Sequence, residues 1–169
     1  MPLSPVRSNG SVGVTPRSRL REGAAVEIPA IALFVRRTAS IRMDPAEFLD
    51  GGAVGVSAET YAVCRTDRDH PDAFATVREA DETTVVVDQD DLDAVDAVDV
   101  ERDWKRLTFE MDLPFELVGF LAAVATALAE AEVSVFVVSS YATDHVFVKE
   151  GDLPAAVRRL EALGCEVSD

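Results

Sequence analysis

The sequence has few residues of the kinds that build metal and redox sites. Its 169 residues include two Cys and two His. Cys64 and Cys165 lie far apart and neither belongs to a CxxC motif, so we expect neither a zinc site nor a disulfide scaffold. His70 and His145 have no second ligand at a metal-binding spacing. The pattern predicts no metal and no cofactor, with both Cys as buried apolar residues of a reducing compartment.

Lysine is scarce as well: the chain contains two lysines, Lys105 and Lys149. Acidic residues dominate, and the net charge is −15. The charge is uneven: residues 1–42 carry +5, and residues 43–169 carry −20. A body of that charge repels nucleic acid and anionic membranes, so we expect neither as a partner. Few lysines and many acids are typical of proteins of a halophilic cytoplasm.

Long apolar runs are missing from the N-terminal segment. Its longest run, residues 28–35, has eight residues, whereas a membrane span needs about 20. Arg36 and Arg37 follow directly, which differs from a secretory signal. We therefore expect residues 1–42 to be a disordered basic tail, or to lie upstream of a true translation start at Met43. The sequence leaves both alternatives open. We expect the protein to be cytoplasmic.

The segment from 43 to 103 has short elements. Residues 44–52 predict a helical turn closed by two Gly, and residues 59–65 predict a strand. Two further strands, 74–78 and 83–87, surround an acidic turn and predict a hairpin.

The segment from 104 to 169 predicts longer elements. The strand 104–111 is followed by a helix whose first residue is Pro114, a position that needs no N–H. Gly119 would then lie inside this helix, where it permits close packing. The apolar residues of the helix recur at spacings of four, three and four, which predicts a core face made of Leu117, Leu121, Val124 and Leu128.

Two strands, a helix and a last strand complete the chain. We expect strands at 133–138 and 145–149, a helix capped by Asp152 and stopped by Gly164, and a strand at 165–168. The order from 104 onward is therefore βαββαβ. With right-handed crossovers it predicts an α+β, ferredoxin-like sandwich of a four-stranded antiparallel sheet and two helices on one face.

An internal repeat predicts a second copy upstream. A shift of 61 residues aligns Val-rich residues 85–87 with 146–148, and the acidic step at 90–92 with 151–153. About eight residues separate the first two strands of the upstream copy, so its first helix is absent or reduced. We expect a degenerate domain at 43–103 and a complete one at 104–169, with chance similarity between Val-rich segments as the alternative.

Residues 139–157, SSYATDHVFVKEGDLPAAV, resemble a segment close to STYDTDYxLV in small proteins of two ACT-like domains, related to the CASTOR-type arginine sensors. Upstream blocks from residue 59 onward resemble the family's successive segments in the same order. The resemblance implies a non-enzymatic regulatory module that binds an amino acid between ACT domains, as a homo-oligomer or on a partner enzyme. An assembly or interaction module with a vestigial pocket is the alternative.

The resemblance implies ligand contacts at Ser140, Tyr141 and Asp144. At the N-terminus of the predicted helix, which begins with Pro114 and Phe115, free N–H groups would hold a ligand carboxylate, and Asp112, just outside the helix, would hold its ammonium. His145 stands where relatives carry a plain aromatic ring, so arginine is not implied as the ligand.

Catalysis on a similar fold is the competing class of function. Acylphosphatase-like enzymes need an Arg-rich phosphate loop and a positioned Asn, but the one Asn of this chain is Asn9, in the basic segment. We therefore expect no catalytic residue and no enzymatic activity. The sequence does not name the bound amino acid, the partner or the oligomeric state.

Overall fold

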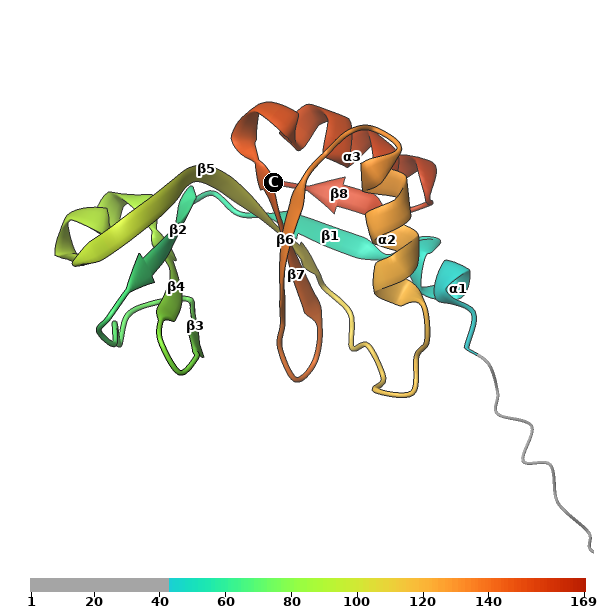
Figure 1. Cartoon of the computed structure of the whole chain (residues 1–169). Coiled ribbons are helices and arrows are strands. Elements are labelled where there is room, and N and C mark those ends of the chain that lie inside the picture. Colours follow the sequence, from blue (N-terminus) through green and yellow to red (C-terminus); the bar gives the residue numbers. More distant parts are fainter. Residues whose placement is uncertain (1–42) are drawn as a thin grey trace, which may run out of the picture. The chain divides into compact units, whose positions relative to one another are not determined.

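The computed structural model describes residues 43–169, and the predicted basic tail at 1–42 lies outside the described residues. The described part contains strands and helices of both short and longer length (Figure 1). The strands are β1 (Ala53–Val56), β2 (Tyr61–Thr66), β3 (Ala75–Arg78), β4 (Thr83–Asp88), β5 (Ala97–Phe109), β6 (Val135–Ser139), β7 (Asp144–Lys149) and β8 (Glu166–Ser168). The helices are α1 (Pro45–Leu49), α2 (Phe120–Ala129) and α3 (Leu153–Ala162), with 3-10 turns η1 (Gln89–Ala94) and η2 (Glu150–Asp152).

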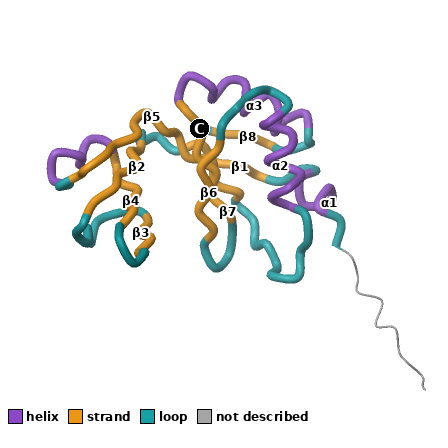
Figure 2. The backbone as a smooth tube through the Cα atoms, in the orientation of Figure 1, coloured by secondary structure: helices purple, strands orange, loops and turns teal. Residues whose placement is uncertain are grey.

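The strand β5 is common to both parts of the sheet (Figure 2). Its first part, residues 97–104, pairs with β2, and its second part pairs with β7 on one edge and with β1 on the other. We predicted that the strand begins at Trp104, and this was wrong, because it begins seven residues earlier. The exposed acids between Ala97 and Trp104 remove the apolar pattern by which a strand is predicted from sequence. Its pairing partner β2 is also distant in the chain.

The C-terminal part of the sheet has the order β8–β1–β5–β7–β6. The four predicted strands are present, but the predicted all-antiparallel sheet is wrong: β1 lies between β8 and β5, and it is parallel to β8. Backbone bonds from Gly51 N–H to Gly164 O (2.8 Å) and from Glu166 N–H to Gly52 O (2.9 Å) hold this insertion. The sheet is therefore mixed.

Both long helices pack on one face of this sheet. Their core is continuous with α1 and β1, since the buried side chains include Leu49, Val54, Leu107, Phe109, Phe120, Val124, Leu128, Val146, Val148, Ala156 and Leu160. The predicted stripe of α2 is confirmed at Val124 and Leu128, which are fully buried. Cys64 and Cys165 are buried as predicted, and burial raises the pKa of both thiols.

The opposite face of β5 and β7 packs against the N-terminal strands. An aromatic cluster of Tyr61, Phe74, Trp104, Phe136 and Phe147 fills this contact, with edge-to-face rings. The N-terminal strands have the order β3–β4–β2–β5, which is the ferredoxin-like order with β5 as its last strand.

The internal repeat corresponds to equivalent elements. β4 and β7 begin and end 61 residues apart, and η1 and η2 follow them directly. Between β2 and β3, residues 67–74 contain no helix, as predicted. The division into tandem domains at residue 103 stays a prediction, because β5 runs through that position.

The start of α2 differs from the prediction. The helix begins at Phe120, and Gly119 is its N-cap with a left-handed φ of 92°. The predicted helical start at Pro114 is wrong, because the residues before Gly119 form a loop in which Pro114 O accepts only the Leu117 N–H. Asp152 is the N-cap residue of α3 as predicted, but its side chain makes no capping hydrogen bond. Gly164, with φ 100°, ends α3 as predicted.

The packing of α1 leads to a first prediction. Leu49 is 2% exposed in the core that it shares with α2, so Leu49→Ala is expected to lower the free energy of unfolding by about 2–5 kcal/mol. Val98→Ala is the control, because Val98 is 62% exposed, and it should change stability by less than about 0.5 kcal/mol. Urea denaturation measures both. Equal effects would contradict the place of α1 in the core.

The backbone of Gly119 leads to a second prediction. A Cβ at this position meets only Pro45 Cγ, at 3.6 Å, so the penalty for Gly119→Ala comes from its φ. We expect a loss of about 1–2 kcal/mol in thermal or urea unfolding. Gly151→Ala is the matched control, since it has open space and no positive φ, and it should be neutral or slightly stabilising.

Candidate functional site

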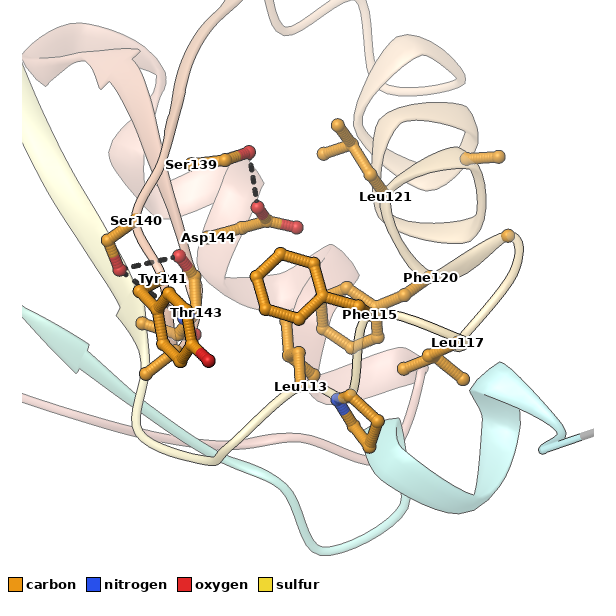
Figure 3. A pocket seen from close by; sticks show the side chains of 14 residues that line it. Leu113, Phe115, Leu117, Phe120, Leu121, Ser139, Ser140, Tyr141, Thr143 and Asp144 are labelled. Atoms are coloured by element: carbon orange, nitrogen blue, oxygen red, sulfur yellow. Dashed lines mark hydrogen bonds between the residues drawn. The ribbon is translucent and has the colours of Figure 1, made fainter.

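A cavity of about 370 Å³ lies between the loop before α2, the first turn of α2 and the hairpin turn that joins β6 to β7 (Figure 3). These segments are distant in the sequence, and the pairing of β5 with β7 brings them together. The residues that line the cavity are Leu113, Pro114, Phe115, Leu117, Gly119, Phe120, Leu121 and Ala122 on one side, and residues 139–144 on the other.

The polar side chains of the hairpin turn mostly hold the turn itself. Ser140 N–H and Ser140 Oγ–H both donate to Thr143 O, at 2.8 and 2.9 Å, and Thr143 N–H donates to Ser140 Oγ at 3.3 Å (Figure 3). Such local bonds are what Ser and Thr supply in turns. The hydroxyl of Ser140 is therefore engaged in the turn, at the rim of the cavity.

Two hydrogen bonds fix the loop before α2 against this turn. Thr143 Oγ1 donates to Phe109 O at 2.6 Å, and Leu113 N–H donates to Ala142 O at 2.8 Å. The end of β5 and the hairpin are thereby held side by side. Pro114 and Phe115 follow Leu113 and are placed at the cavity by this contact.

Asp144 carries the acidic group of the cavity. Its Oδ1 accepts a hydrogen bond from Ser139 Oγ at 2.6 Å, and its side chain is half-buried (Figure 3). Among residues 43–169, no hydrogen bond or ion pair to Oδ2 is found. One carboxylate oxygen is therefore fixed in position while the other has free acceptor capacity.

The N-terminus of α2 supplies the opposite polarity. Its first N–H groups, from Phe120 to Ala122, have no carbonyl of a preceding turn to bond, and Gly119 offers no capping side chain. All four residues line the cavity. A helix N-terminus with open N–H groups favours anions. The cavity therefore has N–H groups without acceptors at α2 and a carboxylate oxygen with free acceptor capacity at Asp144.

Apolar side chains surround the opening. Phe115 is 75% exposed and Tyr141 is 86% exposed, and their rings meet edge to face with centroids 5.1 Å apart (Figure 3). Val118, in the same loop as Phe115, is 82% exposed. Exposed apolar side chains that gather in one patch are typical of surfaces that bind a ligand or another protein.

Five of the six predicted ligand-binding residues line this cavity: Pro114, Phe115, Ser140, Tyr141 and Asp144. Asp112 does not, and its side chain is exposed. His145 is also absent from the lining, because it follows Asp144 in β7 and its side chain points to the opposite face of the sheet.

Sequence reasoning missed the true start of α2. The residues that supply the open N–H groups are Phe120, Leu121 and Ala122, the first of them six residues after Pro114. Gly119 is the signal that was available, since a Gly directly before an apolar periodic run is compatible with an N-cap.

Other kinds of site are not found in the described part of the chain. Residues 43–169 contain no group of three or more His, Cys, Asp and Glu able to hold a metal ion. No helix within this range combines the length and the hydropathy needed to cross a membrane.

Comparison with known proteins gives a family match for part of the chain. Residues 99–162 match the family model described as the ACT domain. This range covers most of β5, both long helices and the cavity. No curated protein sequence matches the chain.

Solved structures are similar over most of the described residues. A protein from Agobacterium tumefaciens is 21% identical with a TM-score of 0.61, and the match covers 70% of this chain and 92% of that one. A Vibrio cholerae protein of unknown function, a possible transport protein, is 25% identical with a TM-score of 0.57, covering 69% and 92%. The ligand-free regulatory subunit of aspartate kinase from Thermus thermophilus is 11% identical with a TM-score of 0.50, covering 68% and 98%.

These comparisons show similarity of the fold over most of the described residues. The finer relation to CASTOR-type arginine sensors is not among them and stays a prediction. Residues 99–162 are thus similar to the ACT domain family, and the described chain has an α+β, ferredoxin-like ACT fold with a mixed sheet.

Proposed function

We propose that this protein is a non-enzymatic regulatory module that binds a free amino acid in the cavity between α2 and the β6–β7 hairpin. The observation that carries the proposal is the pair of opposite polarities across the cavity. The residues of α2 that carry the open N–H groups line one side of it, and Asp144 lines the other side. A zwitterionic amino acid carries the two charges that this arrangement complements.

Three parts of the ligand are bound by different groups of the cavity. Its carboxylate binds the N–H groups of Phe120 to Ala122, and its ammonium donates to Asp144 Oδ2. Its side chain lies toward the opening, where Phe115 and Tyr141 are exposed. The aromatic rings at the opening favour an apolar or a flat cationic side chain. Arginine is therefore one candidate among several amino acids.

The exposed opening also supports binding at an interface. ACT domains pair with one another, and a second domain placed over Phe115, Val118 and Tyr141 would bury these side chains. We propose that this partner is a second copy of the chain or an enzyme that the module regulates. The N-terminal strands support a tandem arrangement within the chain, since their order β3–β4–β2–β5 is that of a ferredoxin-like domain without its helices.

One observation favours a second candidate function, an assembly module with a vestigial pocket. The hydroxyls of Ser140 and Thr143 are both engaged within the protein, so the turn keeps its shape without a ligand. In that case Phe115 and Tyr141 contact another protein and do not contact a ligand.

Thermal unfolding in concentrated KCl against each of the twenty amino acids tests the proposal. A ligand at about 100 times its dissociation constant stabilises the folded state by about 2.7 kcal/mol, which raises the melting temperature. Asp144→Asn is expected to abolish this shift, because the amide loses the charge but still accepts the hydrogen bond from Ser139. Asp112→Asn is the matched control, since Asp112 is exposed outside the cavity, and it should keep the full shift.

The alternatives give different results. No shift with any amino acid, in a folded sample, would rule out the sensor and leave the assembly module. A shift that both variants keep would show that the ligand binds away from Asp144. Loss of the shift together with a large fall in the melting temperature of unliganded Asp144→Asn would assign Asp144 a structural role in the turn.

A further inference from the structure

Arg106 occupies the face of β5 opposite the helices and the cavity. Its guanidinium Cζ lies 4.6 Å from the ring centroid of Phe74 and 5.1 Å from that of Tyr61. Its backbone is fixed by Ser57, whose Oγ accepts the Arg106 N–H at 3.1 Å and whose N–H donates to Arg106 O at 2.9 Å. The backbone of Arg106 is therefore held by Ser57, and two aromatic rings lie beside its guanidinium.

No acceptor in the described chain bonds to this guanidinium. Among residues 43–169, no hydrogen bond and no ion pair to its nitrogens is found, and its Nε is buried without a partner. Exposed arginines nearby do have acidic partners: Arg65 pairs with Asp99, and Arg78 with Asp69 at 2.8 Å. Arg102 and Arg158 also have no bonded acid among residues 43–169, but both are exposed, so the buried and unpartnered Nε is what distinguishes Arg106.

The residues around Arg106 add further donors to this face. Trp104 lies two residues earlier on the same side of β5, and its Nε1 is also buried without an acceptor among the described residues. Thr108 lies two residues later, and its Oγ1 is 3.2 Å from His145 Nδ1. The His145 ring packs edge to face on Phe74, with centroids 5.1 Å apart, so Phe74 contacts both His145 and Arg106.

The chemistry of the guanidinium identifies what it still requires. The Phe74 and Tyr61 rings lie near its carbon atom but offer no hydrogen-bond acceptor, so its N–H groups still need acceptors. A carboxylate matches this fork with two parallel hydrogen bonds. We propose that Arg106 is an anion-binding residue that takes a carboxylate group, with Thr108 and His145 beside it, at a second site on the face of the sheet opposite the α2 cavity.

This site is independent of the amino-acid cavity. Asp144 and His145 are neighbours in β7, so their side chains point to opposite faces. Asp144 belongs to the cavity, and His145 belongs to the Arg106 face. The carboxylate has two possible sources, a small free carboxylate or an acidic side chain from a second copy of this acidic chain.

His145 provides a reporter for the site. Burial lowers the pKa of His145, the Arg106 charge lowers it further, and Asp144 on the same strand raises it. The other titratable groups at this face are the Tyr61 hydroxyl and the Lys149 ammonium, which lies 4.3 Å from the ring centroid of Trp104. Burial raises the pKa of Tyr61, the Arg106 charge lowers it, and Glu59 and Asp88 raise it. A carboxylate bound to Arg106 offsets the guanidinium charge, so the pKa of His145 should rise when the site is filled.

The experiment is a pH titration of the His145 ring protons by NMR on the whole chain, with and without acetate at constant ionic strength. The chain has two His, so His70→Gln assigns the signals. Acetate is expected to raise the midpoint of His145 saturably, by about one pH unit. In Arg106→Gln the midpoint should already be raised and should not respond to acetate. Arg65→Gln removes an arginine that already has a carboxylate, and should respond like the natural chain.

Further variants test the guanidinium geometry and the independence of the two sites. Arg106→Lys keeps the charge without the planar fork, so it should fold if Arg106→Gln does not, and should show a weaker acetate response. Asp144→Asn should keep the response, which distinguishes this site from the cavity even if the amino-acid proposal fails. A midpoint that rises with protein concentration, rather than with acetate, would support a carboxylate from a second copy.

Two results would overturn the proposal. One is a His145 midpoint that changes with neither acetate nor protein concentration, which would make Arg106 a cation–π contact and nothing more. The other is an acetate response in Arg106→Gln and Arg106→Lys of the same size as in the natural chain.

Discussion

The hydrogen bonding of β5 is the constraint on which the rest of the structure depends. Its first part pairs with β2, and its second part pairs with β7 and β1, so one strand belongs to both parts of the sheet. Asp103 is an irregular position within the strand, with a φ of 63°, and the Gln89 side chain accepts its N–H at 2.8 Å. This irregularity lies directly before Trp104, where the two parts of the sheet begin to pack against each other.

The pairing of β5 with β7 also determines where function can reside. It brings the loop before α2 against the β6–β7 turn and thereby forms the cavity on the helix face. On the other face, the same pairing places Arg106, Thr108 and His145 beside the aromatic cluster. Because side chains alternate along a strand, two adjacent residues of β7 lie on two different faces and belong to two different environments.

The sequence allowed many local elements to be predicted. The β3–β4 hairpin, the two strands on either side of the SSYATDH turn, and the helix that Gly164 ends all follow from apolar patterning and turn residues. The insertion of β1 could not be predicted, because its four residues include Gly55 and its partners, β5 and β8, are more than 50 residues away. The early start of β5 was hidden by its exposed acids, which a strand tolerates on a solvated face.

For the site, the sequence by itself determined which segments carry the polar residues: the loop before α2 and the turn with Ser140, Tyr141 and Asp144. The tertiary structure decided which of these polar groups remain free to hydrogen-bond a ligand and which are exposed outside the cavity. Ser140 is engaged in its own turn, Asp144 retains one carboxylate oxygen, and Asp112 is exposed. It also decided that no acid within residues 43–169 is bonded to Arg106. The physical reason is that local patterns specify backbone conformation, whereas hydrogen-bond partners and burial depend on which distant strands pair.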